Sequence, residues 1–170
     1  MASEKSIFHP QFPLELGRRY AVALYEPCIP LNVGSVARTC ACTGVPLHIV
    51  GTPGFILDSR LAKRAGLDYW EHVELEIHRT WEEFEEKMVG RRMWLFSTKG
   101  DNLLWDAEFK GGDILVFGSE TEGLPDRILG TRPDNVLRIP MVDGRRSLNL
   151  SNAVTVAVYD VLRKNVGHRA

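Results

Sequence analysis

The sequence predicts an α/β fold in which helices flank a parallel β-sheet. From Tyr20 onward, short apolar runs alternate with amphipathic segments, and each pair is separated by Gly or Pro. This alternation is typical of α/β sheets. The apolar runs are nearly continuous, which indicates strands that are covered on both faces and paired in parallel. At 170 residues with 44% hydrophobic content, the chain is long enough to bury one sizeable core.

Five apolar runs are the expected strands, at 20–25, 47–50, 93–97, 113–118 and 135–140. Helices are expected between them, at 32–43, 58–65, 80–89 and 125–129. The third helix has the clearest signals, because Thr80 can cap it and Glu83 follows three residues later. In that helix Trp81, Phe84 and Met88 share one face.

The first residues differ from the rest of the chain. From Met1 to about Leu16, polar groups are mixed with Pro10 and Pro13, a composition that disfavours both helix and sheet. We therefore expect an N-terminal arm at 1–19 and a single domain at 20–170.

The last segment, 147–165, has apolar residues around most of its helical circumference. They are Leu150, Val154, Val156, Val158, Val161 and Leu162. Such a helix must be buried on more than one side. Either a second subunit covers it or it is enclosed in the core of one chain, and the pattern alone favours neither. We predict a homodimer with this helix in the interface.

Charge and composition exclude several classes of protein. The formal net charge is -1, from 21 basic and 22 acidic residues, so a nucleic acid could be bound only by a local basic patch. No apolar stretch reaches the roughly 18 residues of a membrane span, and the first residues lack the apolar core of a signal peptide. These features predict a cytoplasmic protein that has no membrane partner.

The cysteines and histidines predict no metal site. Cys28, Cys40 and Cys42 form neither a disulfide framework nor two spaced pairs for zinc, so we expect buried thiols in a reducing cytosol. The five histidines are scattered and no HExxH motif is present.

The loop at 26–44 follows the first expected strand. Asn32 can cap the helix after it, Gly34 allows close approach of a backbone or ligand, and Arg38 follows. A helix that begins after a strand can bind an anion. Taken alone, this loop is more simply an ordinary turn with a surface arginine.

The loop at 115–125 lies at the carboxyl end of the fourth expected strand, where open α/β sheets bind ligands. Gly118 and Gly123 bracket four polar residues. The loop matches neither GxGxxG nor a Walker A motif, which argues against dinucleotide and nucleoside triphosphate binding. A glycine-rich turn with an exposed acid remains an alternative.

The loop at 139–153 combines the basic pair Arg145 and Arg146 with four polar residues just before the last helix. These are Ser147, Asn149, Ser151 and Asn152. Helix capping would explain one or two of them. The excess suggests donors and acceptors that face a ligand.

Together, the three loops resemble the signature motifs of the SPOUT ribose methyltransferases. The motifs are N-x-G-x-x-x-R at 32–38, F-G-S-E-T-x-G-L-P at 117–125 and I-P-x(6)-S-L-N-L-S-N-A at 139–153. The segments LYEPCIPLNVG and RLAKRAGLDYW are similar to small single-domain members that modify the wobble ribose of leucine tRNAs. The resemblance covers about 20–164.

The resemblance implies a fold and a cofactor. The fold would be a parallel sheet flanked by helices, with a C-terminal deep trefoil knot that no periodicity could indicate, in an obligate homodimer. The cofactor would be S-adenosylmethionine, with Phe96, Gly118, Ile139 and Ser147 as its binding residues. Such pockets hold adenine largely through backbone groups. We expect the last three residues to meet in one cleft beside Arg38.

The implied reaction is 2'-O-methylation of the wobble nucleotide of tRNA, cytidine or modified uridine at position 34. Arg38 matches the arginine proposed as activating group in related enzymes, where the other subunit can supply it. Since a guanidinium stays protonated, we expect Arg38 to hold a phosphate and stabilise the developing alkoxide. The remaining catalytic candidates are Asn32, Glu120 and Asn149, and Tyr159 is a further candidate or an interface residue.

The expected partner is the anticodon loop of tRNA, which a few local basic residues would contact. Those residues are Lys63, Arg64, Arg145 and Arg146. Two alternatives remain: a SPOUT methyltransferase of another tRNA site or of rRNA, and a non-catalytic RNA-binding member of the fold.

Overall fold

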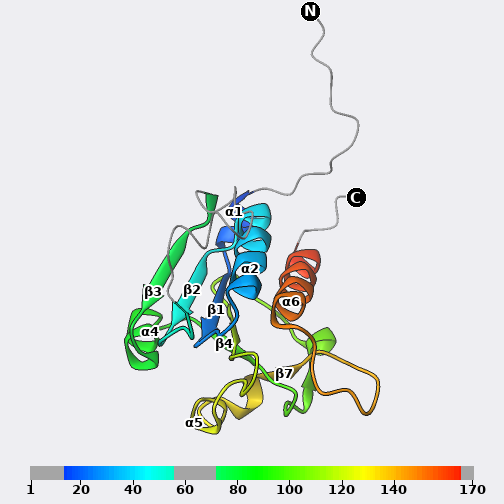
Figure 1. Cartoon of the computed structure of the whole chain (residues 1–170). Helices are drawn as coiled ribbons and strands as arrows, with labels where there is room; N and C mark the ends of the chain where they lie inside the picture. The colour runs from blue at the N-terminus through cyan, green and yellow to red at the C-terminus, as the bar shows by residue number, and fades with distance from the viewer. Residues whose placement is uncertain (1–13, 56–71, 166–170) are drawn as a thin grey trace, which may run out of the picture.

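The computed structural model describes residues 14–55 and 72–165 of the chain (Figure 1). These residues form a seven-stranded sheet in the order β3-β2-β1-β6-β4-β7-β5, and every neighbouring pair is parallel. The strands are β1 (Ala21–Tyr25), β2 (Leu47–Val50), β3 (Leu75–His78), β4 (Met93–Phe96), β5 (Asn102–Leu103), β6 (Ile114–Phe117) and β7 (Val136–Arg138). Because the strands are parallel, their carboxyl ends lie at the same edge of the sheet.

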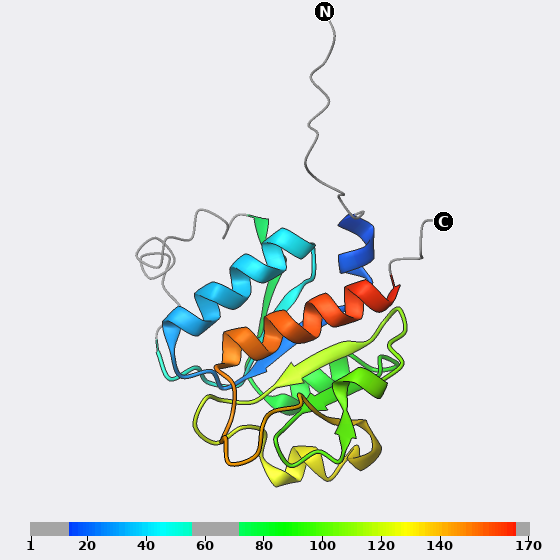
Figure 2. The same cartoon turned by 90° about the vertical axis from the view of Figure 1, so that its right-hand side faces the viewer.

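Helices cover both faces of this sheet. The α-helices are α1 (Leu14–Arg18), α2 (Pro30–Thr43), α4 (Trp81–Lys87), α5 (Asp126–Leu129) and α6 (Leu150–Asn165). Short 3-10 helices are η2 (Leu104–Asp106) and η3 (Pro133–Asn135). Figure 2 shows α2 and α6 side by side across one face, where Thr39 and Thr155 share a 2.8 Å hydrogen bond between their hydroxyl oxygens.

The core has two halves because successive strand residues point to opposite faces. In β1, Val22 and Leu24 belong to the cluster that includes residues of α2 and α6. Ala21 and Ala23 belong to the cluster that includes residues of α4 and α5. The predicted α/β class with a doubly covered parallel sheet is therefore confirmed.

The five predicted strands are confirmed, but β3 and β5 were missed. The segment LEIH of β3 alternates apolar and polar residues, and β5 has two residues, so neither forms a continuous apolar run. Helix α4 is confirmed with its cap: the Oγ1 atom of Thr80 accepts a 3.1 Å hydrogen bond from the backbone N–H of Glu83. The helix predicted at 58–65 lies outside the described residues.

The expectation of no helix before Tyr20 is wrong for α1. The helix begins directly after Pro13, where a proline does not interrupt helical hydrogen bonds. Leu16 is buried in the core, and a Cβ added at Gly17 would lie 1.9 Å from the carbonyl oxygen of Thr43. The last residues of the predicted arm therefore pack against the end of α2.

Two further expectations also need correction. Asn32 is not a helix cap, because α2 already begins at Pro30 with Ile29 as its N-cap residue. Of the three thiols expected to be buried, only that of Cys40 is; burial raises its pKa to about 12. Cys28 and Cys42 are exposed.

Helix α6 is buried on one side and partly exposed on the other. Val154, Val158 and Val161 are in the core, whereas Val156 and Tyr159 are 44% and 48% exposed. The described residues therefore do not enclose this helix on all sides, since apolar side chains remain on its outer surface.

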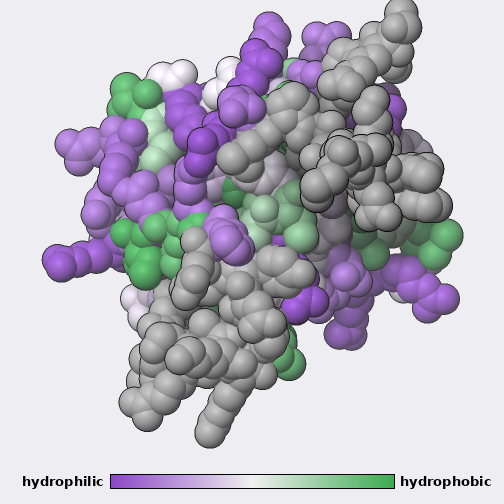
Figure 3. Space-filling model, turned by 90° about the horizontal axis from the view of Figure 1, so that it is seen from above, coloured by the Kyte–Doolittle hydropathy of each residue, from purple (hydrophilic) through white to green (hydrophobic). Residues whose placement is uncertain are grey.

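The molecule's surface is mixed in character. Seen from above, the coloured residues are mostly hydrophilic, and the hydrophobic ones lie in separate patches (Figure 3). Within 14–55 and 72–165, no helix has the length and apolar character needed to cross a membrane.

Candidate functional site

A cavity of about 670 Å³ lies at the carboxyl ends of β4, β6 and β7. The loops that follow these strands line it, together with the first turns of α2 and α6. The volume is within the range of about 300–1,000 Å³ that is usual for small-molecule sites. The topology therefore brings the three loops singled out in the sequence to one place.

Two aromatic rings form an apolar part of the lining. Phe96 ends β4 and Phe117 ends β6, and the strands pair these two residues directly. Their rings stack with centroids 4.4 Å apart and an interplanar angle of 12°. Leu137 and Ile139 also line the cavity. This surface suits a flat, largely apolar ligand group.

Glu120 joins the loop after β6 to the start of α2. Its Oε2 accepts a 2.7 Å hydrogen bond from the backbone N–H of Cys28. Its Oε1 accepts bonds of 3.0 Å from the backbone N–H of Ile29 and 2.9 Å from the side-chain amide of Asn32. The carboxylate therefore satisfies two donors at the helix N-terminus, where negative charge is favoured.

These contacts determine the ionisation of Glu120. Burial alone would raise the pKa of its carboxyl group, but the hydrogen bonds from Asn32, Cys28 and Ile29 favour the charged form. The net result is a lowered pKa, so Glu120 is a carboxylate at neutral pH. Both oxygens of this carboxylate are thus occupied by donors.

Asn149 connects the third loop to this network. Its Nδ2 donates a 2.9 Å hydrogen bond to Oδ1 of Asn32. Its Oδ1 accepts bonds from the backbone N–H groups of Ser151 at 2.9 Å and Asn152 at 3.3 Å. The residue thus caps α6 and also fixes the beginning of this helix against α2.

Gly118 makes the tight loop after β6 possible. A Cβ at this position would lie 2.0 Å from the carbonyl carbon of Gly123 and 2.1 Å from the backbone nitrogen of Leu124. The turn is closed by a 3.0 Å bond from the N–H of Gly123 to the carbonyl oxygen of Ser119. Gly123 has φ of 68°, a conformation that favours glycine.

Comparison with known proteins identifies the family to which this chain belongs. Residues 19–159 match the model of the SpoU rRNA Methylase family. The chain belongs to the SpoU methylase family. A Methylovorus glucosotrophus protein named tRNA (cytidine(34)-2'-O)-methyltransferase is 42% identical over 147 residues, which are 86% of this chain and 96% of that protein. An Escherichia coli protein of the same name is 44% identical over 144 residues, 84% of this chain and 92% of that one.

Two solved structures share the fold. One, described as giving structural insights into the 2-OH methylation of C/U34 on tRNA, has a TM-score of 0.81 and 46% identity, with coverage of 85% and 95%. The SpoU methyltransferase AviRb from Streptomyces viridochromogenes, in complex with AdoMet, has a TM-score of 0.76 at 24% identity. That match covers 88% of this chain and 58% of AviRb, and it shows similarity of fold.

The cavity of this SpoU family member contains most of the residues selected from the sequence. They are Asn32, Phe96, Gly118, Glu120, Ile139, Arg146, Ser147 and Asn149. The expected convergence of Gly118, Ile139 and Ser147 on one cleft is observed. Their roles in binding or catalysis remain predictions.

Arg38 does not line this cavity, so the expectation that it lies beside the same cleft is wrong for a single chain. It lines a second hollow, of about 520 Å³, together with Leu31, Thr155 and Tyr159. The reason is helical geometry, since six residues of α2 rotate Arg38 to a different face from Asn32. Arg38 and Tyr159 are both exposed on the surface formed by α2 and α6.

The other basic candidates are distributed differently. Arg145 is exposed but does not line the cavity, and Lys63 and Arg64 lie outside the described residues. Sequence reasoning missed Arg138, which lines the cavity at the end of β7. Its position at a strand's carboxyl end was the available signal. Lys99, also in the lining, forms a 2.7 Å ion pair with Asp126.

Proposed function

We propose that this chain is an S-adenosylmethionine-dependent tRNA methyltransferase that modifies the 2'-hydroxyl of the wobble nucleotide, cytidine or uridine at position 34. The observation that carries the proposal is the single cavity where Gly118, Ile139 and Ser147 meet, in a chain whose relatives have that name. Leucine tRNAs are the expected substrates because of the segment RLAKRAGLDYW.

The residues present fit S-adenosylmethionine. Phe96, Phe117 and Ile139 offer apolar surface for an adenine, and the loop after β6 offers backbone groups beside Gly118. Ser147 supplies a polar group for the amino acid moiety. When bound, this cofactor supplies an electrophilic methyl group. No metal is required for transfer to a hydroxyl.

The chain's own residues position the reactants. Asn32 bonds to both Glu120 and Asn149, so we assign these three residues to holding the surrounding segments in place rather than to proton transfer. Such fixed geometry lowers the barrier by aligning reacting groups in advance. The guanidinium group of Arg38 would hold the adjacent phosphate and stabilise negative charge on the ribose oxygen. A phosphate oxygen or water then accepts the hydroxyl proton.

A homodimer would bring Arg38 to a reaction centre. Leu31, Val156 and Tyr159 are exposed apolar side chains on α2 and α6, and Arg38 lines the second hollow together with Leu31 and Tyr159. Exposed apolar side chains on adjacent helices favour burial by another subunit. In this proposal each Arg38 acts beside the cofactor of the partner subunit.

The remaining parts of the proposal concern topology and location. We infer a deep trefoil knot in the C-terminal part, supported by the family motifs and by the return of the chain after β7 to place Asn149 against Asn32. We assign catalysis to one domain at 20–170 and expect it in the cytoplasm, where tRNA is found.

The RNA backbone would be contacted by four basic residues, Arg145 and Arg146 with Lys63 and Arg64.

Methyl transfer to defined RNA tests the reaction. The protein is incubated with labelled S-adenosylmethionine and leucine tRNA transcripts, and the modified nucleoside is identified. We expect 2'-O-methylcytidine or 2'-O-methyluridine at position 34. A matched tRNA with 2'-deoxyribose at position 34 should accept no label. Label at another position would contradict the proposal, and absence of cofactor binding in calorimetry would favour a non-catalytic RNA-binding protein.

Replacing Arg38 tests its role. Arg38→Ala should lower methyl transfer by at least about 10²-fold, the loss expected when charge stabilisation is removed, while cofactor affinity and the dimer are retained. Arg79→Ala is the matched control, because Arg79 is exposed and lines neither cavity. Calorimetry and single-turnover rates provide the two measurements. An equal loss of cofactor affinity would show that Arg38 belongs to the binding site instead.

A further inference from the structure

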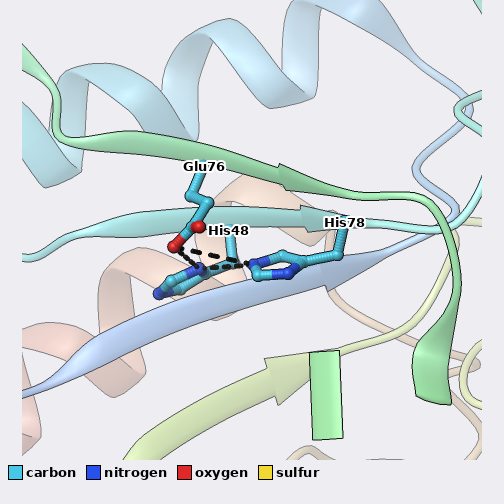
Figure 4. Close-up of side chains that lie close together, drawn as sticks. All are labelled: His48, Glu76 and His78. Carbon is cyan, nitrogen blue, oxygen red and sulfur yellow. Dashed lines mark hydrogen bonds and ion pairs between the residues drawn. The ribbon is translucent and has the colours of Figure 1, made fainter. Parts of the chain in front are cut away.

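Three potential metal ligands meet on the neighbouring strands β2 and β3, outside the cavity described above. His48 lies on β2, and Glu76 and His78 lie two residues apart on β3 (Figure 4). The register pairs His48 with Glu76 and Val50 with His78. Because residues two apart in a strand share a face, all three side chains lie on the same side of the sheet.

The ligand atoms point toward one another. Nδ1 of His48 lies 3.0 Å from Nε2 of His78. Oε2 of Glu76 lies 3.7 Å from Nδ1 of His48 and 3.9 Å from Nε2 of His78. Around tetrahedral zinc, with bonds of about 2.0–2.1 Å, ligand atoms are about 3.3–3.4 Å apart. Each distance therefore needs to change by only a few tenths of an ångström.

The surroundings hold the ligands in place. His48 and His78 are buried, and the ring of Phe84 packs against both imidazoles, with centroids 5.6 and 5.1 Å away. The side chain of Glu76 is 36% exposed, so solvent can reach the cluster from that side. Buried imidazoles with few rotamers are preorganised for binding.

The neighbouring charged residues do not occupy the atoms that would bind a cation. Lys87 is bonded to Oε1 of Glu76, which leaves Oε2 toward the imidazoles. Burial and the neighbouring His78, Arg91 and Lys87 lower the pKa of His48 to about 4. Burial also lowers the pKa of His78, partly opposed by Glu83. Imidazole must be neutral to bind a metal.

We propose that His48, Glu76 and His78 form a binding site for a divalent transition-metal cation of the zinc class. Two imidazoles and one carboxylate are ligands that zinc binds readily, and a water on the side of Glu76 would complete four-coordination. Binding requires both ring lone pairs to point at the ion, so it replaces the hydrogen bond between His48 and His78. The rings can do this by a change of tautomer.

The site would link β3, at one edge of the sheet, to β2. The spacing of the histidines along the chain predicted no metal site, because the two imidazoles are 30 residues apart and are joined only by strand pairing. A bound ion would therefore stabilise the outermost strand pairing of this side of the sheet. This site is independent of the methyl-transfer proposal.

Zinc titration of the chelator-stripped, untagged full chain tests the proposal. Cys28→Ser and Cys42→Ser are included in all samples, so that the two exposed thiols do not bind the ion. Calorimetry should show one zinc ion bound per chain, and melting should shift upward with zinc. Ring-nitrogen NMR signals of His48 Nδ1 and His78 Nε2 should shift on binding.

Matched variants distinguish the site from adventitious binding. Glu76→Gln should weaken zinc binding by at least about tenfold. Glu74→Gln should leave it unchanged, since Glu74 also forms an ion pair, with Arg18, but is not a ligand. His78→Gln should abolish binding, and Glu76→Gln remains decisive if that variant does not fold. No bound zinc, unshifted ring signals or wild-type affinity in Glu76→Gln would overturn the proposal and leave a structural histidine pair.

Discussion

Both carboxylate oxygens of Glu120 are occupied by donors from the start of α2. Asn32 is held in the same way, because its amide nitrogen donates to Glu120 and its amide oxygen accepts from Asn149. Asn32, in the first turn of α2, thus links the loop after β6 to the start of α6. The contribution of these residues to a reaction would come through the positions of the loops.

The lowered pKa of Glu120 makes the stability of the protein depend on pH. A carboxyl group whose pKa is lower in the folded state stabilises the fold above its unfolded pKa, and this stabilisation is lost as pH falls through the folded value. Glu120→Gln should therefore unfold more easily than wild type at neutral pH. The difference should shrink as pH falls below the ordinary value of 4.5.

Urea unfolding of both proteins between neutral and acidic pH measures this difference. Glu122→Gln is the control, because Glu122 is exposed in the same loop. A difference between wild type and Glu120→Gln that does not depend on pH would mean that lost geometry, and not charge, explains the effect.

Most of the residues selected from the sequence lie in the cavity, but their contacts were not predicted. Asn32 was expected to cap a helix, and only the folded chain shows that its amide bridges Glu120 and Asn149 across 88 and 117 residues. A motif identifies which polar residues matter. It does not reveal whether they face a ligand or one another, because that depends on packing between distant loops.

The loop after β6 depends on close packing of its own backbone at Gly118. Gly118→Ala should destabilise the fold by about 1–3 kcal/mol, as overpacking does, because the new methyl group would meet the backbone of Gly123 and Leu124. Backbone atoms cannot move aside as a side chain can. The variant should also lose cofactor affinity, since the displaced loop lines the cavity.

Chemical unfolding and cofactor titration test this expectation. Gly111→Ala is a suitable control, because its Cβ would meet only the far end of the Arg19 side chain, at 3.1 Å. Unchanged stability and cofactor affinity in Gly118→Ala would show that the loop tolerates a side chain there.

Elements with strong local signals were predictable, and those defined by their neighbours were not. The strand at 47–50 was predicted with its observed bounds, because it is buried on both faces and apolar apart from His48. β3 contains the polar residues Glu76 and His78, so its sequence alone does not indicate a buried strand. Its place in the sheet depends on the packing of β2 and α4 against it. β5 exists only because β7 lies beside it.

At the scale of the whole molecule, the surface of α2 and α6 determines the expected assembly. Val156→Lys combined with Tyr159→Glu should convert the proposed dimer into a monomer, because charged groups would have to be buried in the interface. Methyl transfer should fall with dimerisation if Arg38 acts across subunits. Sedimentation and methylation assays on the same samples measure both quantities.

Val89→Lys serves as the matched control, because Val89 is 79% exposed and follows α4 rather than lying on α2 or α6. It should remain dimeric and active. A wild-type chain that sediments as a monomer would rule out the shared site, and a monomeric but active double variant would place all catalytic groups in one chain.

The two outer strands of the sheet have a consequence for behaviour at high concentration. β5 has only two residues, so it exposes few unpaired backbone groups to another molecule. At the opposite side, Glu76 precedes the exposed Ile77 of β3 and Glu74 lies directly before the strand, and these acidic residues would repel an identical strand placed alongside. The folded protein therefore offers a poor template for fibril growth, and concentrated solutions should resist this form of aggregation.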